Sequence, residues 1–133
     1  MQREKDYLKK KIDKLAVMLA ELLAKMSKTN NTFTKEEFET KLDEILRQET
    51  KLYFSMILEM KEDDFIEELK QKHNLNSNQL YVLADLLYHY SLNFEENTTH
   101  LNPKIVALYE NSIAEGIVIS LNKYTLIDKL KNN

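Results

Sequence analysis

The sequence predicts an all-α protein, a compact bundle of five to six helices that ends in an antiparallel helical hairpin. Two observations predict this class. Apolar residues recur every three or four positions through most of the 133 residues, which is the spacing of a helical face. The chain also contains one glycine and one proline, whereas sheet proteins need many such residues in their turns. At this length we expect one helical domain spanning residues 1–133.

Residues 1–28 predict a long amphipathic helix. Its apolar stripe alternates steps of four and three residues and consists of Leu8, Ile12, Leu15, Leu19, Leu22 and Met26. Two interpretations of this stripe are open. We favour packing within the same chain, because Met18 and Leu23 make the apolar face wider than a two-stranded seam. The heptad-like spacing alternatively predicts an interface with a second copy or a partner helix, which would make the protein a homodimer.

The middle of the chain predicts two or three further helices. Thr34 followed by Glu37 is typical of a capping box and places a helix start there. The apolar pattern then continues to Met60 across a polar interruption at residues 48–51, so either one bent helix or two helices occupy the stretch. A short helix follows and ends near His73.

Residues 77–123 predict the closing hairpin. Asn76 is a suitable N-cap for a helix over residues 77–92. Asn102 followed by Pro103 is typical of a cap with proline in the first helical turn, and the apolar pattern extends this second helix to about residue 123. The polar connection between the two helices is short enough to make them antiparallel neighbours.

The second helix of this hairpin contains the only glycine of the chain. We expect Gly116 to permit close approach of a bulky neighbour such as Tyr88, since a mid-helix glycine destabilises by about 1 kcal/mol relative to alanine and needs a packing reason. Thr125 with Asp128 three residues later predicts the cap of a final turn or two.

The first and last parts of the chain resemble a known family. Lys5 to Ile12 on the leucine-rich first helix, together with the hairpin stretches Leu83–Tyr88 and Leu108–Ala114, resembles a family of small bacterial all-helical proteins of unknown function. The C-terminal end of that family is similar to a tetratricopeptide-type hairpin. The resemblance covers most of the chain in layout. It implies a fold type and the binding of a protein partner, and it carries over no catalytic residue.

Three tyrosines of the hairpin are candidates for a peptide-binding groove. Tyr81, Tyr88 and Tyr109 combine apolar area with a polar tip, which suits the recognition of a protein partner. Such tyrosines also fill the interfaces between helices as ordinary core, and we favour that interpretation. The sequence leaves both open.

Asp85 and His89 lie one helical turn apart and are the main candidates for chemistry. As an alternative function, they would hold a metal ion or act as catalytic groups in a bundle interior. We favour a structural role, because the chain has no Glu-x-x-His pair, no glycine-rich loop and no cysteine. The sequence therefore predicts no cofactor, no metal site and no enzymatic activity.

Charge and hydropathy restrict the partners. The net charge is −3, the first 28 residues are basic and the remainder is acidic. The lysines at positions 9–11 are diluted by Asp6 and Asp13, so we expect a solvated face and no nucleic-acid binding. The uncharged run Leu15–Ala20 is too short for a membrane span or a signal sequence. We expect a cytoplasmic, non-enzymatic interaction module whose partner is another protein or a second copy.

Overall fold

The computed structural model describes residues 13–27, 33–94 and 99–132. Within these ranges the chain forms seven α-helices and two short 3₁₀ helices, and it contains no strand. The all-α prediction is therefore confirmed, whereas the number of helices exceeds the five or six expected. Two members of the predicted stripe, Leu8 and Ile12, lie outside the described residues.

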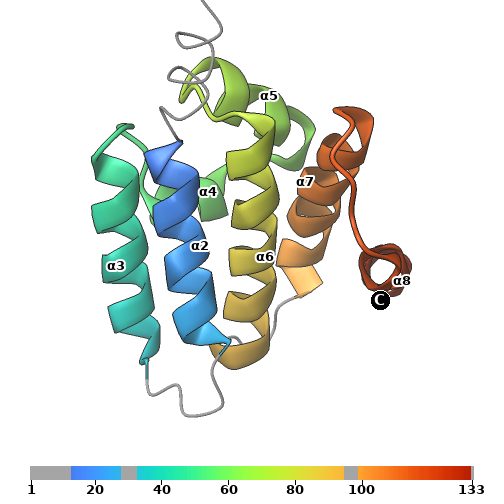
Figure 1. The fold of residues 1–133 in the computed structure, drawn as a ribbon, viewed down its shortest axis with the longest axis horizontal. Helices are drawn as coiled ribbons and strands as arrows, with labels where there is room; N and C mark the ends of the chain where they lie inside the picture. Colours follow the sequence, from blue (N-terminus) through green and yellow to red (C-terminus); the bar gives the residue numbers. More distant parts are fainter. Residues whose placement is uncertain (1–12, 28–32, 95–98, 133) are drawn as a thin grey trace, which may run out of the picture.

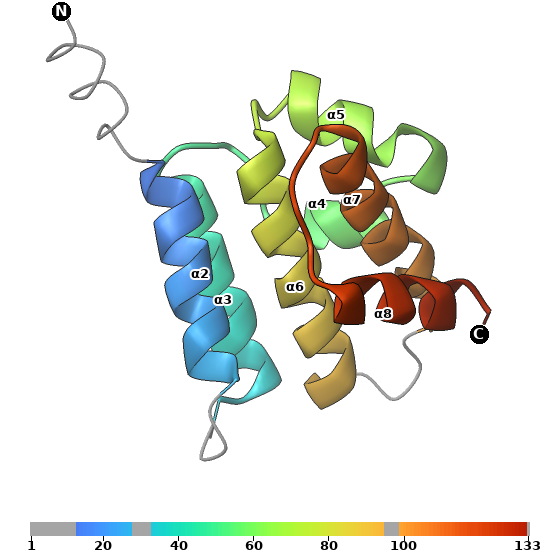
Figure 2. The same cartoon turned by 45° about the vertical axis from the view of Figure 1, so that its right-hand side comes forward.

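Four helices lie side by side, and the others cover their ends and edge. The α-helices are α2 (Lys14–Met26), α3 (Lys35–Arg47), α4 (Phe54–Glu59), α5 (Phe65–Gln71), α6 (Ser77–Phe94), α7 (Asn102–Ala114) and α8 (Leu121–Lys131), and the 3₁₀ helices are η1 (Glu62–Asp64) and η2 (Thr99–Leu101). Figure 1 shows the order α3, α2, α6, α7 across the molecule, with α3 antiparallel to α2, α2 parallel to α6, and α7 antiparallel to α6. Figure 2 shows α8 crossing α7 at a steep angle. None of the described helices is both long and apolar enough to cross a membrane.

Helix α2 begins at Lys14 because Asp13 is its N-cap. The backbone of Asp13 is not helical (φ −60°, ψ 87°), and its carboxylate accepts a hydrogen bond from the amide of Ala16 at 3.0 Å. The same carboxylate accepts hydrogen bonds from the side chains of Asn76 at 2.6 Å and Gln79 at 2.7 Å. Burial alone would raise the pKa of Asp13, but these three hydrogen bonds outweigh it and lower the pKa. This carboxylate thus ties the start of α2 to the start of α6.

Two capping predictions are confirmed at the starts of α3 and α6. The hydroxyl of Thr34 accepts from the amide of Glu37 at 3.1 Å, and the Glu37 carboxylate accepts from the amide of Thr34 at 3.3 Å. Asn76 and Gln79 exchange the equivalent pair of hydrogen bonds at 2.9 and 2.8 Å. Each pair satisfies two amides that have no partner inside their helix.

The stretch from Phe38 to Met60 contains two helices, α3 and α4. The break follows Arg47, and Thr50 stabilises it by donating its hydroxyl hydrogen to the carbonyl of Leu46 at 2.7 Å. Asp43, on α3, accepts a hydrogen bond from the first amide of α4, that of Phe54, at 2.7 Å. A side chain of one helix therefore caps the next.

Helix α7 ends at Ala114, so the expectation of one helix over residues 103–123 is wrong in its second half. Gly116 ends the helix, because its φ of 87° lies in the left-handed region that glycine adopts without steric cost. The amides of Gly116 and the following residue donate to carbonyls three and five residues earlier, at 3.0 and 2.9 Å. These two hydrogen bonds form the Schellman motif that commonly closes a helix.

The expected roles of Gly116 and of the residues after it are therefore wrong too. No atom lies within 4 Å of the place where a Cβ of Gly116 would be, so the glycine does not permit close approach of Tyr88. Thr125 and Asp128 lie inside α8 instead of capping it, and the Thr125 hydroxyl donates to the carbonyl of Leu121 at 3.4 Å. The residue before α8 is Ser120, whose side chain makes no capping hydrogen bond.

Candidate functional site

The apolar stripe of α2 lies inside this chain's own core. The exposed fractions of Leu15, Leu19, Leu22 and Met26 are between 1% and 4%. They face α3 and α6, which flank α2 on either side (Figure 1). These four side chains are not available to a partner while the fold is intact, and this corrects the hypothesis that they form an interface.

The three candidate tyrosines do not form an open groove. Tyr109, on α7, is fully buried, whereas Tyr81 and Tyr88, on α6, are half-buried. The rings of Tyr81 and Tyr109 meet edge to face, with centroids 6.0 Å apart. Tyr109 is therefore a core residue of the interface between α6 and α7, and the groove hypothesis is wrong for it.

Asp85 joins three helices through one carboxylate. It lies on α6 and accepts a hydrogen bond from the hydroxyl of Tyr109, on α7. It also accepts one from the ammonium of Lys123, on α8, at 2.5 Å, and this ammonium lies 3.4 Å from the Tyr109 hydroxyl. The Asp85 and Lys123 side chains are only 13% and 25% exposed, so water screens this pair less than a surface pair. We call these three residues the α8 anchor, because they fasten α8 to the body of the protein.

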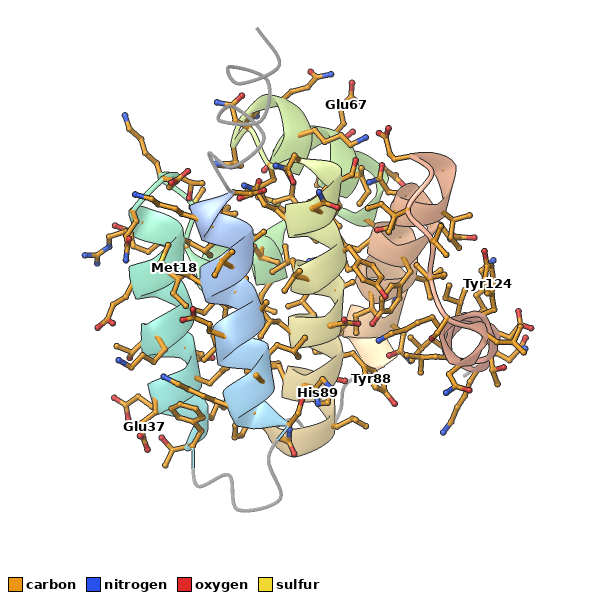
Figure 3. All side chains as sticks on the ribbon, in the orientation of Figure 1. Met18, Glu37, Glu67, Tyr88, His89 and Tyr124 are labelled. Carbon is orange, nitrogen blue, oxygen red and sulfur yellow. The ribbon has the colours of Figure 1, made fainter. Side chains whose placement is uncertain are left out.

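His89 lies one helical turn after Asp85, near the C-terminal end of α6, where Figure 3 labels it, and the charges of Asp85 and Lys123 both act on it. Burial lowers the pKa of His89 below its ordinary value; Lys123 acts in the same direction, and Asp85 acts against both. The imidazole is therefore neutral at pH 7. Asp85 already accepts from two donors, and no group of three His, Cys, Asp or Glu side chains that could hold a metal ion occurs in the described part of the chain.

The α8 anchor predicts a measurable alkaline sensitivity. Burial raises the pKa of Tyr109, and the charge of Asp85 and the hydrogen bond to it act in the same direction. Above pH ~10 the unfolded chain loses a tyrosine proton that the folded chain keeps, so the free energy of unfolding falls by up to about 1.4 kcal/mol per pH unit from this group. Urea unfolding between pH 9 and 11 should show a shallower fall in Tyr109→Phe than in the wild type.

Tyr53→Phe is the matched control for this measurement. Tyr53 is 40% exposed and lies between α3 and α4, outside both the α8 anchor and the α8 patch, so this variant should leave the wild-type pH dependence in place. Equal slopes for the wild type and Tyr109→Phe would contradict the role assigned to the buried hydroxyl.

An exposed apolar surface lies directly before and within the first turn of α8. Val118 is 94% exposed, Leu121 is 83% exposed and Tyr124 is 48% exposed. Figure 3 shows Tyr124 on the side of the molecule away from α2 and α3. We call these three residues the α8 patch. Sequence reasoning missed it, although the uncharged run from Ile117 to Leu121 follows the only glycine and was the available signal.

One hollow in the described surface is lined by polar side chains. Its volume is about 220 Å³, it lies on the outer side of α5, and its lining residues are Asp64, Glu67, Glu68, Gln71 and Lys72. Its side chains are mostly exposed, and the ammonium of Lys72 lies 3.9 Å from the carboxylate of Glu68. This arrangement is typical of a solvated helix face.

The candidate site is therefore the segment that carries α8. Its inner side holds the charged α8 anchor, and its outer side presents the apolar α8 patch. This combination is suited to binding and contains no nucleophile paired with a base. When the chain was compared with protein-family models, curated proteins and solved structures, no match was found.

Proposed function

We propose that this protein is a non-enzymatic interaction module that associates with a second copy of itself through the α8 patch. The observation that carries the proposal is the exposure of Val118, Leu121 and Tyr124, at 94%, 83% and 48%, within seven consecutive residues. The other exposed large apolar side chains of the described residues lie singly on different parts of the fold, and they are Val17 at 43%, Tyr53 at 40% and Leu92 at 62%. Large apolar side chains that cluster on a surface are typical of protein-binding sites. The α8 patch thus replaces the α2 stripe as the contact surface.

The free energy gained by burying two copies of the α8 patch is similar in size to the entropic cost of bringing two chains together. Burying a valine or leucine side chain contributes about 1.5–3 kcal/mol, so the four such side chains of a symmetric pair contribute about 6–12 kcal/mol. The two Tyr124 rings add further apolar area. The loss of translational and rotational freedom costs on the order of 4–15 kcal/mol, so we expect a reversible dimer of modest affinity.

The charge distribution favours a second copy as the partner. In a two-fold symmetric interface the same surface lies on both sides, and residues near the axis meet their own copies, so a charge there would be repelled by its symmetry mate. Residues 116–122 carry no charge, and the ammonium of Lys123 is directed inward to Asp85. Two copies of the α8 patch can therefore meet without like-charge repulsion.

The test is the mass of the full-length protein in solution. Light scattering at high protein concentration should give about twice the chain mass of 15.8 kDa for the wild type, and a value near one chain for the double variant Val118→Asp, Leu121→Asp. Leu121 is the first residue of α8, where an aspartate suits the helix dipole, so α8 itself should persist. Circular dichroism should show the same helix content in both proteins.

Val17→Asp is the matched control. Val17 is an exposed apolar residue, 43% accessible, on α2, which lies on the opposite side of the molecule from α8 (Figure 2). This variant should dimerise like the wild type. A wild type that is monomeric at every concentration would refute the proposed function, and a dimer that survives both aspartates would refute the contact surface.

A further inference from the structure

We infer that the two copies associate by exchanging α8, so that each α8 packs on the α7 of the other chain. This inference rests on the proposed self-association and specifies its geometry. It follows from three features of the segment after Gly116. Helix α8 makes few contacts with the rest of the protein, its connection to α7 is extended, and exposed apolar residues lie in and next to that connection.

Helix α8 is attached to the body by few contacts. Of its eleven residues only Ile127 and Leu130 are buried, and both are slightly exposed, at 5% and 8%. Its polar contacts are the α8 anchor and an exposed ion pair in which the Lys131 ammonium lies 2.8 Å from the Glu110 carboxylate. The polar contacts join α8 to α6 or α7, and α7 is the described helix that α8 mainly contacts. The α6 and α7 of a second copy offer the same surfaces.

The connection between α7 and α8 includes residues 117–120, which we call the hinge. After the left-handed Gly116, residues 117–120 are neither helical nor in a turn, and Ser120 is extended (φ −71°, ψ 158°). Three of the four are β-branched, which favours an extended backbone. In the described residues, the amides of Val118 and Ile119 donate to no other backbone group, so the extended hinge of a second copy could accept their hydrogen bonds.

The exposed residues lie where exchange would bury them. When a terminal helix is exchanged, its contacts are rebuilt on the partner, and the only new surface forms where the two hinges pass each other. Val118 lies in the middle of the hinge, and Leu121 lies at its junction with α8. Exchange therefore keeps the contacts of Ile127, Leu130 and Lys123 and in addition covers Val118 and Leu121 of the α8 patch.

Chemical cross-linking distinguishes exchange from face-to-face pairing. The chain has no cysteine, so the double variant Glu110→Cys, Lys131→Cys carries a single reactive pair, at an exposed site that tolerates substitution. A bismaleimide with a reach similar to the two replaced side chains should be added to the dimer fraction from gel filtration. If α8 is exchanged, position 131 of one chain lies next to position 110 of the other chain. Most of the product on a denaturing gel should then be a covalent dimer.

The pair Lys70→Cys, Glu115→Cys is the matched control. The native side chains at these positions form an ion pair between α5 and the residue after α7, and both positions precede the hinge. Their cross-link should stay within one chain in every form of the protein. Lys131→Cys alone gives the level of covalent dimer from chance collisions, which the test pair should exceed several-fold.

The outcomes separate this inference from the proposed function. A dimer fraction in which the 110/131 pair cross-links only within single chains would overturn exchange and leave self-association through the α8 patch standing. The absence of any dimer fraction would overturn the proposed function itself. Covalent dimers from the 110/131 pair, with single chains from the 70/115 pair, would establish exchange.

Discussion

Replacing Phe38 with alanine should lower the free energy of unfolding by about 3–5 kcal/mol, the range found when a buried phenylalanine is removed from a core. Phe38, on α3, is completely buried. Its ring centroid lies 5.4 Å from that of Tyr90, 5.9 Å from that of Phe54 and 6.0 Å from that of Phe94. The ring thus joins α3 to α4 and α6, and its removal leaves a cavity that rigid aromatic neighbours cannot fill.

This loss is large compared with the stability of a single domain, which is about 5–15 kcal/mol. Urea denaturation should show a lower midpoint for Phe38→Ala with little change in slope. Tyr53→Ala is the control, because Tyr53 is 40% exposed and contacts Arg47 at the surface, 5.4 Å from ring centroid to guanidinium carbon. A loss below about 1 kcal/mol for Phe38→Ala would mean that the four aromatic rings do not form one rigid cluster.

Local patterns in the sequence were enough to predict the all-α fold and the capping boxes. Thr34 with Glu37, and Asn76 with Gln79, act over three residues, so the partners are visible in the sequence. For the α2 stripe, the periodicity predicted which side of the helix is apolar. It did not predict which other helices pack against that side. Which neighbour covers a helical face depends on packing between segments far apart in the chain.

The end of α7 was missed for a physical reason. Ile113, Ile117 and Leu121 recur every four residues, so the pattern continues as if the helix did. Gly116 interrupts it, because the left-handed conformation and the two Schellman hydrogen bonds stop the helix whatever the spacing of apolar residues. The consequence is functional, since Leu121 becomes part of an exposed surface instead of a continuous core face.

The α8 anchor could not be predicted, because its members are 24 and 38 residues from Asp85 in sequence. Asp85 and Tyr109 were each identified as candidates, but for unrelated roles in a metal site and a groove. For Lys123 the sequence pattern indicates only a position near the end of a helix. Their contact depends on how α7 and α8 cross, which no local pattern specifies.

Lys104 is the second residue whose replacement should have a large effect. It lies on α7 and is 5% exposed, and its ammonium donates to the carbonyls of Ile57 at 2.9 Å and Leu58 at 2.7 Å. These carbonyls belong to α4, a helix of six residues whose last carbonyls have no partner within it. The ammonium also lies 5.4 Å from the ring centroid of Phe65. One side chain therefore caps α4 from a distant helix.

We expect Lys104→Met to lower the free energy of unfolding by about 2 kcal/mol. Leaving a buried carbonyl without a donor costs about 1–3 kcal/mol, and two carbonyls are affected. Two effects reduce the loss: methionine fills a similar volume, and the variant no longer buries a charge. Burial lowers the pKa of Lys104, with Glu62 acting in the opposite direction, which shows that its charged form carries a desolvation cost.

The pH dependence gives an independent check on Lys104. Because its pKa is lower in the folded chain, the unfolded chain binds more protons just below the ordinary lysine pKa, and this residue makes stability rise with pH there. Lys104→Met should lose that contribution, so its free energy of unfolding should fall more steeply than that of the wild type between pH 9 and 10.5. Lys131→Met, which removes an exposed ammonium at the end of α8, should change stability far less. If the two variants unfold at the same urea concentration, the carbonyls of α4 do not depend on Lys104, and α4 must be held by the cap from Asp43 and the packing of Phe54 and Ile57.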